Sequence, residues 1–103
     1  MSILEIDVDD LYDRRAAGPV LVVDVREPHE YAEGHVPGAL LIPLGELPDR
    51  VGELPEEDPL VLICAVGSRS HRAAEFLSAQ GRETINVVGG TVAWIDAGFP
   101  VDR

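Results

Sequence analysis

The single cysteine of the chain, Cys64, is followed by residues whose types and spacing suit thiol chemistry. Gly67 comes three residues later and Arg69 five residues later, with Ser68 and Ser70 on either side of the arginine. Glycine permits the tight turn that points several N–H groups into one concavity, and arginine adds positive charge beside it. A free cysteine is often only a small buried apolar side chain. This loop pattern instead predicts that Cys64 is a nucleophile.

The segments on either side of Cys64 place the thiol between a strand and a helix. Residues 60–63 form an apolar run that is typical of a strand covered on both faces. A helix is predicted to begin near residues 68–70, and its free N–H groups point back toward the loop. Residues 60–82 carry three arginines and one glutamate, which makes this the one locally positive stretch. Both features favour the thiolate, so we expect the pKa of Cys64 to lie below about 8.5.

The rest of the chain alternates short apolar runs with helical periods. Strands are predicted at residues 3–6, 19–24, 39–42, 60–63 and 84–88, and helical segments at residues 7–18, 27–33, 48–54, 68–81 and 90–98. Most of these strands are apolar on both faces, as in sheets that are covered on both sides. The alternation predicts an α/β fold with a mainly parallel sheet and helices on both faces.

In an open α/β sheet, ligands bind outside the carboxyl ends of the strands. Asp24 and Arg26 stand where the run at residues 19–24 ends, so the same edge should gather them with Cys64 and Arg69. We expect Asp24 and Arg26 to brace the site rather than to react.

The composition excludes several classes of function. The 103 residues predict one domain over residues 1–103, with 19 acidic and eight basic residues and a net charge of −11. Such an acidic chain is repelled by nucleic acid and by anionic membranes, so neither is an expected partner. All eight basic residues are arginine, which excludes lysine Schiff bases and the lysine of a P-loop.

The lone cysteine excludes an internal disulfide and a zinc site built from cysteine pairs. His29, His35 and Cys64 do not have the spacing of metal ligands, so no metal is expected. The amino terminus lacks the pattern of a signal peptide, and no apolar run is long enough to span a bilayer. We therefore expect a soluble, cytoplasmic protein.

Three further residues have structural interpretations. His35 lies in a Gly-His-Val-Pro-Gly turn and is predicted to be structural, whereas His71 is predicted to be an exposed helix residue. Trp94 falls at helical spacing with Val92 and Ile95, which predicts a place in the core.

The motifs of the chain, taken together and in order, resemble those of single-domain rhodaneses, a family of sulfurtransferases. The matching pieces are Asp24-Val25-Arg26, Glu30-Tyr31, Gly34-His35-Val36-Pro37-Gly38-Ala39, the segment from Cys64 to Ser70, Gly89-Gly90 with Trp94, and Gly98-Phe99-Pro100-Val101. They span nearly the whole chain. The resemblance implies a rhodanese-like α/β fold with a central parallel five-stranded sheet and helices on both faces.

The resemblance also implies a reaction, and with it roles for the loop residues. The Cys64 thiolate attacks the outer sulfur of thiosulfate, releases sulfite and carries the sulfur as a persulfide to cyanide or to a thiol. Donors to the bound sulfur come from the loop, namely Ala65, Val66, Gly67, Ser68 and Ser70. Arg69 is expected to hold the sulfonate oxygens with its planar fork. No cofactor is implied, and the partners are a small sulfur donor and a thiol acceptor, including a protein sulfur carrier.

Two features of the loop bear on the substrate. Four residues separate Cys64 from Arg69, whereas the phosphatase and arsenate-reductase relatives of the family have a loop one residue longer. Many family loops carry a basic residue directly after the cysteine, but here it is Ala65. We therefore expect a persulfide, rather than thiosulfate, to be the sulfur donor. The alternative is a rhodanese-fold module that relays sulfur or regulates a partner without turnover.

Overall fold

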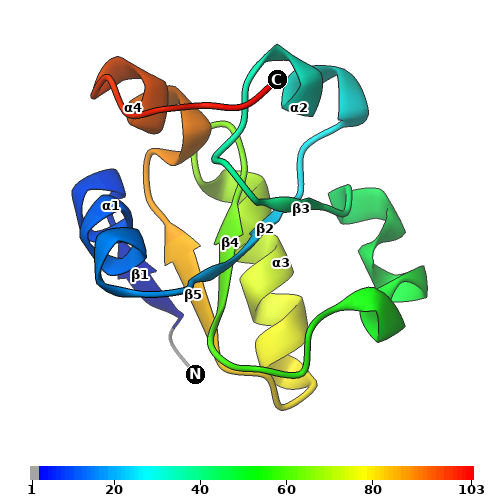
Figure 1. Cartoon of the computed structure of the whole chain (residues 1–103). Coiled ribbons are helices and arrows are strands. Elements are labelled where there is room, and N and C mark those ends of the chain that lie inside the picture. Colours follow the sequence, from blue (N-terminus) through cyan, green and yellow to red (C-terminus); the bar gives the residue numbers. More distant parts are fainter. Residues whose placement is uncertain (1–2) are drawn as a thin grey trace.

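The computed structural model describes residues 3–103 and contains a five-stranded sheet in the order β1-β5-β4-β2-β3, with every pair parallel (Figure 1). The strands are β1 (Leu4–Ile6), β2 (Leu21–Asp24), β3 (Leu40–Leu41), β4 (Leu60–Ile63) and β5 (Thr84–Val87). The helices are α1 (Val8–Ala17), α2 (Pro28–Glu33), α3 (Ser68–Ala79) and α4 (Gly90–Asp96), with two 3₁₀ segments, η1 (Leu44–Asp49) and η2 (Val51–Glu53). The predicted α/β fold with a parallel five-stranded sheet is confirmed. Met1 and Ser2, the first residues of the predicted domain, lie outside the described residues.

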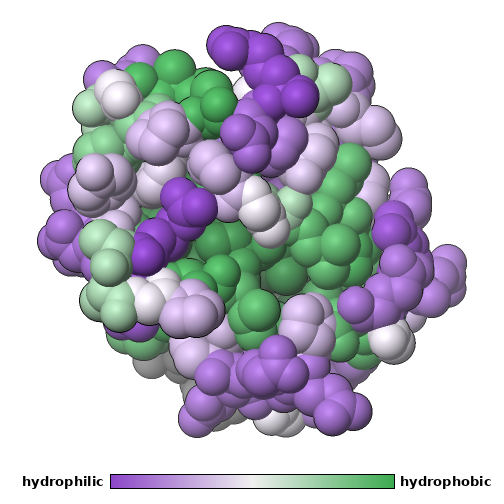
Figure 2. Space-filling view, in the orientation of Figure 1, coloured by the Kyte–Doolittle hydropathy of each residue, from purple (hydrophilic) through white to green (hydrophobic). Residues whose placement is uncertain are grey.

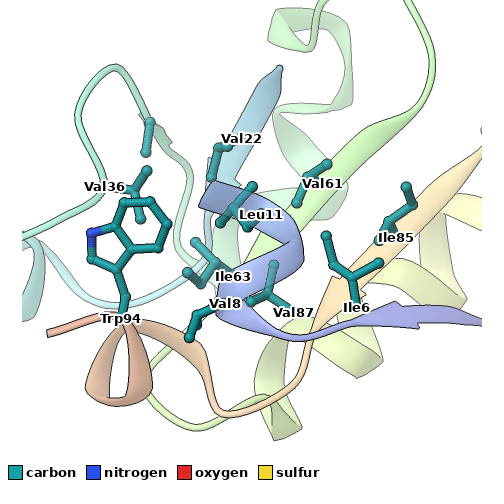
Figure 3. Close-up of a cluster of buried hydrophobic side chains, with 11 residues drawn as sticks. Ile6, Val8, Leu11, Val22, Val36, Val61, Ile63, Ile85, Val87 and Trp94 are labelled. Carbon is teal, nitrogen blue, oxygen red and sulfur yellow. The ribbon is translucent and has the colours of Figure 1, made fainter. Parts of the chain in front are cut away.

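Helices cover both faces of the sheet, and each face has its own apolar cluster. Ile63 and Val87 pack on one face with Leu11 of α1 and Trp94 of α4 (Figure 3). Leu62 and the side chain of Cys64 lie on the other face, in the cluster that contains Leu77 of α3. All four residues of β4 are buried, as expected for the central strand of a covered parallel sheet. The thiol therefore follows the most enclosed strand of the molecule.

Two sequence predictions about the middle of the chain were wrong. Residues 39–42 were expected to form a buried strand, but β3 has only two residues, and Leu40 is exposed because β3 lies at the edge of the sheet. Residues 48–54 were expected to form a helix that starts at Pro48. Instead, Pro48 lies inside the 3₁₀ segment η1, and Gly52 lies in the separate segment η2. Proline lacks an N–H donor and glycine weakens a helix, so this stretch makes only short 3₁₀ turns.

One face of the molecule combines a hydrophilic border with an apolar centre (Figure 2). Figure 2 shows the face seen in Figure 1, where an apolar, hollowed area over the middle of the sheet is ringed by hydrophilic residues. Within residues 3–103, no helix has the length and apolar character needed to cross a membrane.

Candidate functional site

The thiol loop, residues 64–67, connects β4 to α3 and wraps around the sulfur of Cys64. Gly67 adopts a left-handed conformation, with φ of 108°, directly before the first residue of α3. Its N–H donates to Sγ of Cys64 at 3.1 Å. A Cβ atom at this position would also lie 3.3 Å from the carbonyl oxygen of Val87, so glycine suits the close approach to β5. The expected turn of N–H groups toward the sulfur is present.

A buried polar chain lies behind the sulfur. The hydroxyl of Ser70 lies 3.3 Å from Sγ of Cys64 and 2.6 Å from Oδ1 of Asn86, and both Ser70 and Asn86 are buried. The Asn86 amide in turn donates to Glu5 at 2.9 Å and to the carbonyl of Gly67 at 3.2 Å. The same amide therefore holds both the loop backbone and the serine that contacts the sulfur.

The pKa of the Cys64 thiol lies below its ordinary value. Burial alone raises this pKa, but hydrogen bonds from the Ser70 hydroxyl and from N–H groups of the loop and the first turn of α3 outweigh the effect. The direction agrees with the sequence expectation. The cause differs in part, because hydrogen bonds rather than arginine charges are the main stabilisers of the thiolate.

The start of α4 closes the site from the opposite side. The N–H and the hydroxyl of Thr91 both donate to the carbonyl of Cys64, at 2.8 and 3.0 Å, and the N–H of Val92 donates to the carbonyl of Ala65 at 3.0 Å. Gly90 allows this approach, since a Cβ there would lie 2.5 Å from the Cys64 carbonyl oxygen. These contacts fix the backbone of the thiol loop and leave its N–H groups free to face the sulfur.

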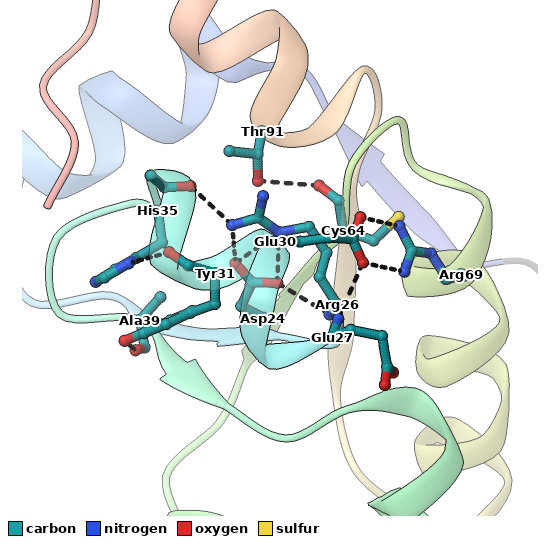
Figure 4. Close-up of polar contacts among 11 residues, drawn as sticks. Asp24, Arg26, Glu27, Glu30, Tyr31, His35, Ala39, Cys64, Arg69 and Thr91 are labelled. Carbon is teal, nitrogen blue, oxygen red and sulfur yellow. Dashed lines mark hydrogen bonds and ion pairs between the residues drawn. The ribbon is translucent and has the colours of Figure 1, made fainter. Parts of the chain in front are cut away.

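Asp24 and Arg26 form a buried ion pair at the carboxyl end of β2. The Arg26 guanidinium donates to both carboxylate oxygens of Asp24, with a shortest distance of 2.8 Å, and to the carbonyl of Gly34 at 2.9 Å (Figure 4). The backbone N–H of Arg26 also donates to Asp24 at 3.0 Å. The side chains thus bind each other and the turn that follows α2.

Arg69, in the first turn of α3, makes a bidentate ion pair with Glu30 of α2. Its two terminal nitrogens lie 2.8 and 2.9 Å from the two carboxylate oxygens of Glu30 (Figure 4). The arginine fork that was expected to hold an oxyanion is therefore already engaged by a carboxylate. This contact joins residues that are 39 positions apart, and the sequence analysis did not anticipate it.

The outer side of the loop is partly apolar. Val66 is 60% exposed, and Ser68 is exposed beside it, so the side chains of both lie on the outside of the loop. Val92 and Ile95 of α4 are also exposed, and they line a hollow of about 390 Å³ together with Ala65 and Thr91. Cys64 itself is fully buried, so a reactant must displace part of this surface to reach the sulfur.

The remaining residues singled out in the sequence have defined places. His35 is buried and lies flat against Tyr31, and His71 is partly exposed and 3.4 Å from Glu75. Trp94 is fully buried, which confirms the prediction that it belongs to the core. The sequence analysis missed the roles of Glu30 and Asn86, although Glu30 lies in one of its motifs. Among residues 3–103, no group of His, Cys, Asp and Glu side chains is arranged to hold a metal ion.

The fold and the site define an α/β protein that holds a single thiol at the carboxyl edge of a parallel sheet. The rhodanese-like domain family matches residues 7–97. A sulfurtransferase of Allochromatium vinosum is 39% identical over 99 residues, which cover 94% of this chain and 92% of that protein. The crystal structure of a rhodanese-related protein from Thermoplasma volcanium is similar, with a TM-score of 0.89, 38% identity, and coverage of 96% and 97% of the two chains. The chain belongs to the rhodanese-like family.

A further relative is described as a sulfur carrier. The putative sulfur carrier protein YrkF of Bacillus subtilis is 46% identical over 74 residues, which cover 71% of this chain and 40% of that protein. The similarity therefore involves only part of that longer protein.

Proposed function

We propose that this chain is a sulfurtransferase in which Cys64 carries the transferred sulfur as a persulfide. Membership of the rhodanese-like family and the likeness to a sulfurtransferase support sulfur transfer as the activity. The observation that carries the assignment to Cys64 is the set of N–H donors to its sulfur, which come from Val66, Gly67 and Ser70. Donors that stabilise a thiolate also stabilise the persulfide anion that replaces it.

The first step is attack by the Cys64 thiolate on the outer sulfur of the donor. The bond from that sulfur to the rest of the donor breaks, and its electron pair leaves with sulfite or with a thiolate. In the second step, an acceptor thiolate or cyanide attacks the outer sulfur of the Cys64 persulfide, and the Cys64 thiolate is released. With a single cysteine in the chain, the acceptor must come from outside.

Each neighbouring group has a role in this scheme. The thiol loop and Ser70 supply donors to the sulfur, and Asp24 and Arg26 hold the adjoining turn in place. The exposed apolar side chains of Val66 and Val92 offer a contact surface for a protein acceptor, in keeping with the sulfur carrier relative. We propose that residues 1–103 act as one domain, with no cofactor.

Intact mass spectrometry after exposure to a sulfur donor tests the proposal. We expect one added sulfur atom on the native chain, removed by cyanide and absent from the Cys64→Ser variant. The donors to compare are thiosulfate and a hydropersulfide. If neither adds sulfur to the folded native chain, the proposal is wrong, and the alternative of a binding module without turnover replaces it.

A further inference from the structure

Arg69, which was expected to bind an anionic sulfur donor beside the thiol loop, is instead paired with Glu30. Both terminal nitrogens of Arg69 are engaged, at 2.8 and 2.9 Å. Glu30 is itself held in place, because its carboxylate accepts the N–H of Glu27 at 3.0 Å in the capping box of α2. The carboxylate is therefore a fixed part of the site rather than a mobile surface group.

Glu30 is charged under all ordinary conditions. Its hydrogen bonds with Arg69 hold its pKa at about 2, well below the usual 4.5. Because Arg69 also remains charged, the pair as a whole is neutral. The residue after the cysteine, Ala65, brings no charge to compensate.

We propose that Glu30 is a specificity-determining residue that disfavours anionic sulfonate donors such as thiosulfate and leaves hydropersulfides, R–S–SH, as the preferred donors. The inference rests on the proposed function. A sulfonate must either displace Glu30 from the fork of Arg69 or bind the remaining N–H groups of a guanidinium whose charge Glu30 already offsets. A hydropersulfide has no sulfonate and requires no such displacement.

The two sulfur donors differ in their leaving groups. With thiosulfate, the Cys64 thiolate takes the outer sulfur and a sulfite dianion departs. With a hydropersulfide, the S–S bond breaks, the Cys64 persulfide forms as S–SH, and a thiolate RS⁻ departs. The second route places a single negative charge in the transition state, so it depends less on a free arginine fork.

Glu30→Gln is the most informative variant because glutamine also serves at this position of a capping box. It removes the charge that faces Arg69 while helix α2 keeps its amino-terminal cap. Glu33→Gln is the matched control, since Glu33 is an exposed residue of the same helix. Within residues 3–103, Glu33 forms no ion pair. Glu33 lines the same hollow as Glu30, so the control reports the effect of removing a nearby carboxylate that is not paired with Arg69.

The experiment measures the rate of sulfur loading on Cys64 by intact mass, with thiosulfate and with 2-hydroxyethyl hydropersulfide as donors. In Glu30→Gln, we expect the second-order rate with thiosulfate to rise about fivefold, the scale of a partly exposed ion pair. We expect the rate with the hydropersulfide to change by less than about twofold, and Glu33→Gln to change neither rate by more than that. In the Arg69→Gln background, the gain from Glu30→Gln should disappear, because the gain acts through the arginine.

The outcomes separate this inference from the proposed function. If the native chain loads from the hydropersulfide but Glu30→Gln does not load faster from thiosulfate, the inference is wrong and the sulfurtransferase assignment stands. An equal gain in Glu33→Gln also contradicts the inference, because the loss of any carboxylate near the hollow would then explain it. If no variant loads from either donor, the proposed function itself fails.

Discussion

Two arginine–carboxylate pairs stand at the same edge of the sheet, and they differ mainly in burial. In the Asp24–Arg26 pair the side chains are 0% and 7% exposed, whereas in the Glu30–Arg69 pair they are 24% and 34% exposed. The chemistry of the two contacts is alike, with an N–O distance of 2.8 Å in each. The comparison shows that the same kind of ion pair has a different effect on the fold when water reaches it.

The degree of burial determines how much the loss of each ion pair costs the fold. Arg26 also binds the Gly34 carbonyl, so removing one member leaves a buried charge or carbonyl without a partner. The Glu30–Arg69 pair is partly open to solvent, so water screens it and its loss costs the fold little stability. The first pair is therefore a structural brace, whereas the second contributes less to the stability of the fold.

The largest expected effect concerns the stability of the fold. Asp24→Ala should lower the free energy of unfolding by about 3–5 kcal/mol, because it leaves the buried charge of Arg26 uncompensated. Glu30→Gln should lower it by no more than about 1 kcal/mol. Urea denaturation of both variants measures the two losses. Equal losses would contradict the distinction between the pairs.

A smaller effect is expected on the pKa of Cys64. It sharpens the comparison by testing whether the more exposed arginine, Arg69, influences this pKa. Ser70→Ala should raise the pKa of Cys64, since it removes the hydroxyl that lies 3.3 Å from the sulfur and lowers this pKa. Arg69→Gln should raise it less, because the guanidinium is already paired with Glu30. The ultraviolet absorbance of the thiolate, followed against pH, reports both values. A larger rise in Arg69→Gln would show that charge, and not hydrogen bonding, stabilises the thiolate.

The smallest expected effect is a change of stability with pH. Arg69 holds the pKa of Glu30 at about 2, below the 4.5 of the unfolded chain, so the pair stabilises the fold fully above pH 4.5. This contribution is lost as the pH falls from 4.5 toward 2. The difference in unfolding free energy between the native chain and Glu30→Gln should therefore shrink over that range. A difference that stays constant through acid titration would mean that Glu30 contributes through packing alone.

The sequence predicted the parts of the fold that depend on local patterns. The apolar run at residues 60–63 predicted the central strand, and the helical period at residues 7–18 predicted α1. The thiol loop was also predictable, because the conformation of Gly67 and the start of α3 follow from a short stretch of chain.

The contacts that join distant segments could not be predicted in the same way. The pairing of Glu30 with Arg69 depends on how α2 and α3 meet, and the place of Asn86 depends on the neighbouring positions of β4 and β5. The count of charges along residues 60–82 predicted a positive environment for Cys64. In the folded chain, however, the carboxylate of Glu30 pairs with Arg69. Spatial neighbours, not sequence neighbours, set the electrostatics of the site.

The polar chain behind Cys64 also has a consequence for the order of events during folding. It links Glu5 to Asn86 across 81 positions, and the thiol loop is held by Thr91, which follows Cys64 by 27 positions. Contacts between such distant positions form late, because loop closure opposes them until the rest of the chain is in place. An incomplete chain therefore carries an ordinary thiol. We expect the lowered pKa of Cys64 only when the first strand and the last helix have both docked, so that the state of this thiol reports completion of the fold.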